Sequence, residues 1–144
     1  MTRKQSKRLA REGVDEYGRT PLHDAVIAHD LREVQRLLME GENPNAQDDS
    51  GWTPLHFAAQ DVLAEISALL LASGAEHSRT DSSGNTPLFR ATFCSRGDGS
   101  VIRLLREAGA DPHHENRRGI SPVKLARTIS NYDVAQFFSD IDTR

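Results

Sequence analysis

The ten residues GWTPLHFAAQ at positions 51–60 carry the strongest structural signal in this chain, because close variants of them return at regular intervals. The related stretches are GRTPLHDAVI from Gly18, GNTPLFRATF from Gly84 and GISPVKLART from Gly119. The first three copies are spaced by 33 residues, and the fourth follows after 35. A fixed period of this length indicates an array of stacked structural repeats.

Each part of the repeated stretch has a structural role. Thr53 followed by Pro54 is typical of a helix start, because the hydroxyl caps backbone N–H groups and proline suits the first helical position. Leu55, Ala58 and Ala59 recur at helical spacing, so they predict a buried helix face. The small alanine side chains allow neighbouring helices to approach closely.

A second helix is predicted before each member of another glycine series. Leucine pairs precede Gly41, Gly74 and Gly109, and glycine accepts the left-handed conformation that ends a helix. The polar residues 41–51 then have turn chemistry. Each copy therefore predicts a helix, a turn, a second helix and an extended hairpin loop, which we call a finger. One copy cannot bury its apolar face alone, so we expect a short solenoid of stacked copies.

The stretches DEYGRTPLHDAV (15–26) and DDSGWTPLHFAA (48–59) resemble ankyrin repeats, whose signature includes Thr-Pro-Leu-His and a period of 33 residues. The resemblance covers residues 15–141. It implies an all-α repeat solenoid with ankyrin-type stacked helix pairs and projecting hairpin loops.

The resemblance also implies roles for single residues. In the family, the histidine of the signature belongs to a structural hydrogen-bond network, and this role carries over to His23 and His56. It does not carry over to the third and fourth copies, where Phe89 and Lys124 replace the histidine. The polar residues Lys124 and Arg127 suggest that the last copy is a capping repeat with a solvated outer face.

The repeats divide the chain into five segments. The third copy carries a two-residue insert within CSRGDGS (94–100), which predicts a longer loop between its helices. The segments are a basic N-terminal segment (1–14) that is partly disordered or a short helical cap, three repeats (15–47, 48–80 and 81–115) and a C-terminal capping repeat (116–144).

Composition limits the classes of function. The formal net charge is −3, so the whole chain is not suited to polyanions. The single cysteine, Cys94, excludes an internal disulfide and fits a reducing compartment. No apolar run approaches a membrane span, and the basic N-terminus lacks the apolar core of a secretory signal. These features predict a cytoplasmic protein that does not act on membranes.

Charge is distributed unevenly along the chain. Residues 15–80 hold 12 acidic residues against 4 basic ones, whereas residues 81–144 hold 8 against 9. Two interpretations stay open at this point. The acidic residues are either ordinary solvated surface or a patch that meets a basic partner.

Catalytic patterns for phosphate, dinucleotide and zinc-protease chemistry are absent, so we expect no enzyme activity, no cofactor and no metal. Three weaker features of the sequence have chemical or recognition potential. Cys94 with a histidine could form a reactive dyad, and His113, His114 and Glu115 carry metal-ligand chemistry. The tripeptide at 96–98 matches an integrin-binding motif. An inert thiol, a polar loop and a chance match are the simpler interpretations.

Binding is instead expected on the concave surface that the family forms from its finger tips and the outer sides of its first helices. Arg117, Arg118 and Ile120 are the finger positions of the last copy. Scaffold requirements do not determine the residues at such positions. The predicted partner-binding residues are Glu16, Tyr17, Arg19, Asp24, Ile27, Asp49, Ser50, Trp52, Phe57, Gln60, Asp61, Ser83, Asn85, Arg90 and Phe93.

Tyr17, Trp52 and Phe57 are the expected anchors, because large rigid aromatics are enriched at interface hot spots. Their acidic surroundings favour a partner with a basic contact surface around an apolar or cationic group, docked on the first two repeats. An arginine of the partner over Trp52 would add a cation–π contact. The alternative is that these rings pack within the scaffold.

The predicted function is therefore a non-enzymatic protein–protein interaction module, monomeric on its own, with no small-molecule substrate and no nucleic-acid target. Two further interpretations remain open at this point. One is a dedicated inhibitor, such as a bacterial immunity protein that neutralises a toxin or effector. The other is a purely structural scaffold.

Overall fold

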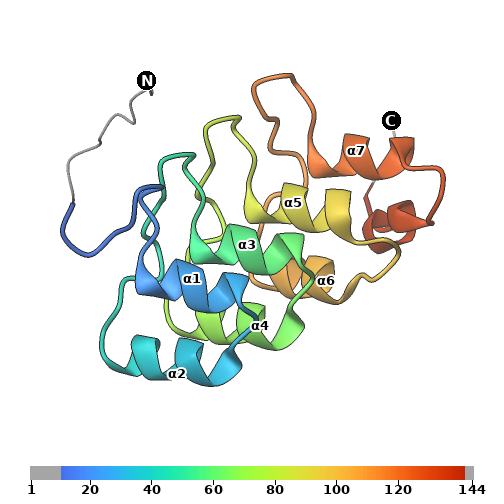
Figure 1. Ribbon diagram of the computed structural model, residues 1–144. Helices are drawn as coiled ribbons and strands as arrows, with labels where there is room; N and C mark the ends of the chain where they lie inside the picture. The colour runs from blue at the N-terminus through green and yellow to red at the C-terminus, as the bar shows by residue number, and fades with distance from the viewer. Residues whose placement is uncertain (1–10, 142–144) are drawn as a thin grey trace.

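The computed structural model describes residues 11–141, and this part of the chain forms a row of stacked helix pairs (Figure 1). Residues 1–10 of the predicted N-terminal segment (1–14) lie outside the described residues, and residues 11–14 contain no helix. Within 11–141 the structure contains no β-strand, and no helix there has the length and apolar character needed to cross a membrane. The helices are α1 (Pro21–Ile27), α2 (Leu31–Met39), α3 (Pro54–Gln60), α4 (Ala64–Ala72), α5 (Pro87–Cys94), α6 (Ser100–Glu107) and α7 (Pro122–Thr128), followed by the 3-10 helix η1 (Val134–Phe138).

The helices lie in two layers. The first helices of the pairs, α1, α3, α5 and α7, run side by side, and each packs on the next. The second layer contains α2, α4 and α6, and η1 packs under α7. The loops that connect one pair to the next all project from the same side, beyond the N-terminal ends of the first helices (Figure 1). This arrangement confirms the predicted all-α solenoid.

The first helix of each copy begins as its Thr-Pro or Ser-Pro pair predicts. The side-chain oxygen of the capping residue accepts a hydrogen bond from the backbone N–H three residues later, at 3.2 to 3.3 Å. The proline then occupies the first turn, where its missing N–H costs nothing. The capping residues are Thr20, Thr53, Thr86 and Ser121.

His23 and His56 connect neighbouring repeats through hydrogen bonds, as the resemblance implies. Both rings are fully buried. Nδ1 of His56 accepts from the backbone N–H of Thr53 at 3.1 Å, so the other ring nitrogen carries the proton. Nε2 of His56 donates to the backbone oxygen of Asn85 at 2.9 Å, and that of His23 donates to the oxygen of Trp52 at 2.8 Å. Each histidine thus joins its own helix to the next finger.

One apolar core runs through all four copies. Leu22, Leu55 and Leu88 occupy the same place in successive first helices, and all three are fully buried. Ala58 and Ala59 are also fully buried between α3 and its neighbours, which confirms the close packing predicted from their size.

Gly51 shows why the fingers can stack closely. Its φ of 81° lies in the left-handed region, and a Cβ placed there would lie 2.9 Å from the Cα of Asp81 in the next finger. Any larger residue would therefore be strained in its own finger and would push the next one away.

The third and fourth copies differ from the regular pattern. The insert lengthens the loop between α5 and α6, as predicted, and Phe137 packs directly against Gly99 at its end. Where the earlier copies have a second α-helix, the last has the short 3-10 helix η1, which Arg106 holds through an ion pair with Asp140 at 2.7 Å. The last copy therefore closes the core with less helix than a full repeat.

Candidate functional site

The fingers are built as preformed turns. In the second finger (48–52), the Asp48 carboxylate accepts hydrogen bonds from the backbone N–H groups of Ser50 and Trp52, at 2.9 and 2.8 Å. Asp15, Asp81 and Asn116 do the same in the other fingers (15–19, 81–85 and 116–120). Side chains on the fingers therefore project from a fixed backbone.

Neighbouring fingers are also joined backbone to backbone. Asp49 N–H donates to Tyr17 O at 2.9 Å, Ser82 N–H donates to Ser50 O at 2.9 Å, and Arg117 N–H donates to Ser83 O at 3.0 Å. One hydrogen bond of this kind at each junction makes the finger row a single surface.

Six of the predicted binding residues, three from the fingers and three from α3 and α5, form one continuous stack of rings and guanidinium groups. The Arg19 guanidinium carbon lies 5.0 Å from the ring centre of Tyr17 and 5.2 Å from that of Phe57. The rings of Phe57 and Trp52 are 4.7 Å apart, and Arg90 lies 4.9 Å from Trp52 and 5.6 Å from Phe93. We call this set the aromatic–arginine stack: Tyr17, Arg19, Phe57, Trp52, Arg90 and Phe93.

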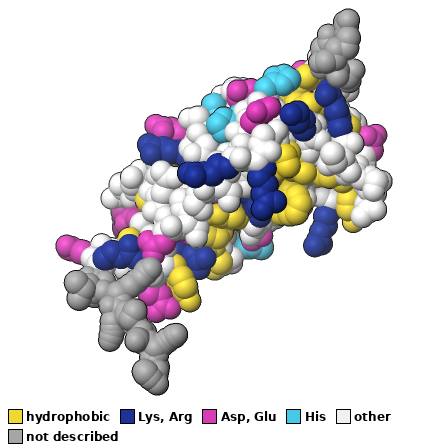
Figure 2. Space-filling view, turned by 90° about the horizontal axis from the view of Figure 1, so that it is seen from above, with side chains coloured by type: hydrophobic (Ala, Val, Ile, Leu, Met, Phe, Trp, Pro, Cys, Tyr) yellow, Lys and Arg dark blue, Asp and Glu magenta, His cyan; other side chains and the backbone are white. Residues whose placement is uncertain are grey.

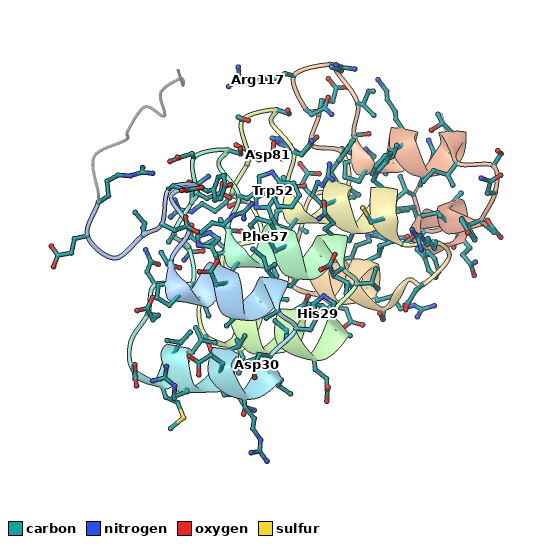
Figure 3. The ribbon with its side chains drawn as sticks, in the orientation of Figure 1. His29, Asp30, Trp52, Phe57, Asp81 and Arg117 are labelled. Atoms are coloured by element: carbon teal, nitrogen blue, oxygen red, sulfur yellow. The ribbon has the colours of Figure 1, made fainter. Side chains whose placement is uncertain are left out.

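The two ends of the stack are exposed, and its centre is partly covered. Tyr17 is 54% exposed and Phe93 is 58% exposed, whereas Trp52 and Phe57 are half-buried. Figure 3 shows Trp52 above Phe57 on α3. The alternative that these rings pack within the scaffold therefore holds in part for Trp52 and Phe57. The expectation that a partner supplies the arginine over Trp52 needs correction, because Arg90 of this chain already lies there.

Several acidic residues of the first two repeats contact arginine or histidine side chains of the same chain. Arg11 lies 2.9 Å from Asp49, and His29 lies 2.9 Å from Asp61. Asp48, which forms the finger turn, is buried and 3.6 Å from Arg19. The negative charge around Tyr17, Trp52 and Phe57 is thus smaller than the number of acidic residues in the first two repeats suggests.

The remaining predicted residues have different surroundings. Asp24 and Ile27 are exposed on α1, and Ser50, Ser83 and Glu16 are exposed on the fingers. Gln60 accepts a hydrogen bond from Arg90 at 2.9 Å. Asn85 differs from the prediction of a surface contact, because it is only 8% exposed and its side-chain oxygen accepts from Asn116 at 2.9 Å. It joins two fingers rather than facing solvent.

A groove lies between the third and fourth fingers, away from the first two repeats on which docking was predicted. Its volume is about 500 Å³. We call it the finger 3–4 groove, and its charged residues are all arginines. It is lined by Ser82, Ser83, Asn85, Asn116, Arg117, Arg118 and Ile120 from the fingers, and by Phe89, Arg90, Phe93 and Leu125 from α5 and α7.

Two signals in the sequence point to this groove in retrospect. Phe89 stands where the first two copies have the bridging histidine, and it lines the groove. Leu125 occupies the same place in its repeat as Arg90, at a spacing of 35 residues. Arg117, Arg118 and Ile120 are finger positions but were not among the predicted binding residues.

Basic and apolar side chains lie next to each other on the finger side of the molecule. Figure 2 shows lysine and arginine side chains beside hydrophobic ones across this face. The surface therefore combines exposed rings with guanidinium groups.

The weaker chemical candidates do not form a centre. Burial raises the pKa of the Cys94 thiol, which leaves less of the reactive thiolate. His114 contacts the backbone oxygen of Gly84 at 3.2 Å, and Glu115 pairs with Lys124 at 3.4 Å. Within residues 11–141 no three histidine, cysteine or acidic side chains gather closely enough to hold a metal ion.

Stacked helix pairs with a row of joined fingers define a helical repeat protein. The sequence matches the family model described as ankyrin repeats (3 copies) over residues 26–116, and the chain belongs to the ankyrin-repeat family. The fourth pair, α7 with η1, lies beyond the matched span. A search of curated proteins found no significant match. Ankyrin repeats are protein–protein interaction modules and are generally not enzymes.

Proposed function

We propose that this chain binds a protein partner on the concave surface formed by its fingers and first helices. The aromatic–arginine stack is the observation that carries this proposal. Tyr17 and Phe93 are more than half exposed at its two ends, although nothing in the repeat scaffold requires large rings there. Exposed aromatic and arginine side chains on a rigid support are typical of interface hot spots.

The rigidity of the fingers supports the same proposal. Backbone hydrogen bonds join each finger to the next, and an Asp or Asn side chain closes each turn. A surface that is ordered before binding loses less conformational entropy on association. A purely structural scaffold would not need such a surface.

The charge of the surface changes along the stack. Asp24 and Asp61 lie at the first two repeats and suit a basic region of the partner, whereas Arg90, Arg117 and Arg118 lie at the other end. We propose a monomeric cytoplasmic protein without a cofactor, a small-molecule substrate or a nucleic-acid target. An adaptor and a dedicated inhibitor, such as an immunity protein, would both use this surface. An inhibitor would bind one target tightly and would be encoded beside it.

The test begins with affinity capture from the native host and identification of the bound protein. Binding of that protein is then measured by calorimetry for the double variant Tyr17→Ala/Phe93→Ala. We expect a loss of at least about tenfold in affinity, because hot-spot aromatics contribute about 2 kcal/mol or more each.

The matched control is Met39→Ala, which removes an 87% exposed side chain from the outer helix α2. Equal affinity of the double variant and the wild type would show that the concave surface is not the binding site. A loss in Met39→Ala as large as in the double variant would place the contact on the outer helices.

A further inference from the structure

We infer that the finger 3–4 groove binds an acidic, partly apolar segment of the partner protein. This inference rests on the proposed function and adds the place and the chemistry of one contact. It makes the partner acidic at this end of the surface, whereas its basic contact was predicted on the first two repeats.

The first argument is the charge of the groove. Arg90, Arg117 and Arg118 line it, and no acidic residue does. Within residues 11–141 none of these three guanidinium groups lies within ion-pairing distance of a carboxylate, whereas Arg11, Arg36, Arg79 and Arg106 all have such partners. An arginine can hold a carboxylate through two parallel hydrogen bonds. A carboxylate in the groove would therefore meet cations that are not already neutralised.

The second argument is the apolar part of the lining. Phe93 is 58% exposed at the edge of the groove, and Phe89, Ile120 and Leu125 complete its apolar surface. A purely acidic segment would leave Phe93 and the exposed parts of Ile120 and Leu125 in water. A segment that also carries leucine or phenylalanine would cover them and gain from the apolar area buried.

The third argument is the departure of this junction from the regular repeat. At the second junction, His56 donates a hydrogen bond to the next finger. Phe89 holds the equivalent place at the third junction and has no polar group to donate. Instead, Asn116 and His114 join these fingers, through Asn85 at 2.9 Å and Gly84 at 3.2 Å. The junction is thus held together from the fingers while an apolar ring lines the groove.

A protein segment fits this surface better than a nucleic acid does. A phosphate chain that filled the groove and continued along the concave surface would meet Asp24 and Asp61 on the first two repeats. Like charges there would repel it. A peptide can place its acidic residues at the arginines only, and a groove of about 500 Å³ accommodates a few of its side chains.

The test uses the full chain labelled with ¹⁵N and three short peptides that differ in charge alone. One alternates glutamate with leucine, the second has glutamine in place of glutamate, and the third has lysine. A short single-stranded oligothymidine is the fourth probe. Each is titrated up to about 1 mM while backbone amide shifts are recorded, since affinities this weak are still measurable.

We expect the glutamate peptide to cause saturable shifts at residues 82–93 and 116–125, and the glutamine and lysine peptides to bind at least about tenfold more weakly. Arg118→Glu should weaken the binding of the glutamate peptide by about tenfold or more. Arg32→Glu is the matched control, because it makes the same charge change on the exposed face of α2 and should leave binding unchanged.

Three results would overturn the inference. They are no saturable binding of the glutamate peptide, equal binding of the glutamine peptide, and tighter binding of the oligothymidine in the groove. In each case the proposed function is tested separately, by the binding of the captured partner to the Tyr17→Ala/Phe93→Ala variant. A folded spectrum of Arg118→Glu shows that its loss of binding is not a loss of structure.

Discussion

The guanidinium carbon of Arg90 on α5 lies 4.9 Å from the ring centre of Trp52 in the second finger, one repeat away. The same arginine contacts the Phe93 ring and donates a hydrogen bond to Gln60 at 2.9 Å. One side chain therefore links two successive repeats on the concave surface. The contact also makes the single tryptophan of the chain a reporter of this surface.

Removal of the Arg90 guanidinium should loosen Trp52. We expect Arg90→Ala to lower the free energy of unfolding by about 0.5–2 kcal/mol, the range for a cation over an aromatic ring. The emission of Trp52 should shift to longer wavelength, because its ring becomes more exposed. Fluorescence and thermal unfolding measure both effects. Arg32→Ala on the outer helix is the control, and an unchanged emission spectrum in Arg90→Ala would contradict the contact.

Leu55 should be essential to the stack of repeats, because it is fully buried between α3 and its neighbours. Leu55→Ala should cost about 2–5 kcal/mol through the lost transfer free energy and the cavity left behind. Since domains of this kind have total stabilities of about 5–15 kcal/mol, the variant is expected to approach global unfolding. Urea unfolding followed by circular dichroism measures the change. Met39→Ala, at an 87% exposed site, should stay within about 0.5 kcal/mol of wild type.

Stability should fall as the solution becomes acidic, because His23 and His56 are buried in their neutral form. Burial lowers the pKa of both rings below the ordinary value of 6.5. The unfolded chain therefore binds protons that the folded chain does not, and the free energy of unfolding decreases as pH falls below about 6.5. Protonation of His56 would also remove the acceptor at Nδ1 for the Thr53 N–H.

The urea concentration at the midpoint of unfolding, measured at several values between about pH 7.5 and 5, reports this effect. Most carboxylates titrate below that window. The variant His56→Gln should be less stable at neutral pH but should show a smaller loss between the two values. A midpoint that rises on acidification would show that the buried histidines are not the titrating groups.

Gly99 should be required for docking of the last helix. Phe137 packs against it so closely that an added Cβ would overlap the ring, while a φ of −88° leaves the backbone itself unstrained. Gly99→Ala is therefore expected to cost about 1–3 kcal/mol through steric conflict alone. Thermal unfolding of Gly99→Ala, Phe137→Ala and the double variant forms a double-mutant cycle. The two changes should be non-additive, because Phe137→Ala makes room for the alanine. Full additivity would show that the two residues do not interact.

The period of 33 residues, the Thr-Pro helix starts and the two glycine series were sufficient to predict the fold. Each of these signals is local, because a hydroxyl caps its own helix and a glycine ends its own turn. The bridging role of His23 and His56 followed from the family resemblance, and the structure confirms it through bonds to Trp52 O and Asn85 O. Local chemistry repeated four times leaves little freedom in how the copies stack.

The composition of the concave surface was predicted less completely. Tyr17, Trp52, Phe57, Arg19, Arg90 and Phe93 were all named from the sequence as residues that the repeat leaves unexplained. Whether these side chains form one stack depends on contacts between repeats, such as the 4.9 Å between the Arg90 guanidinium carbon and the Trp52 ring centre. The pairing of Asp49 with Arg11 and the burial of Asn85 likewise depend on contacts that the period does not encode.

Sequence periodicity alone was enough for the helix pairs and the fingers, because those features follow from hydrogen bonds within 33 residues, whereas the projection of the fingers from one side was implied by the family resemblance. The charge pattern of the surface and the finger 3–4 groove form only where neighbouring repeats pack together. Arg90 of the third copy comes together in the finger 3–4 groove with Arg117 and Leu125 of the fourth. Side chains at repeat junctions compete for the same space and the same partners, and tertiary packing determines which contacts form.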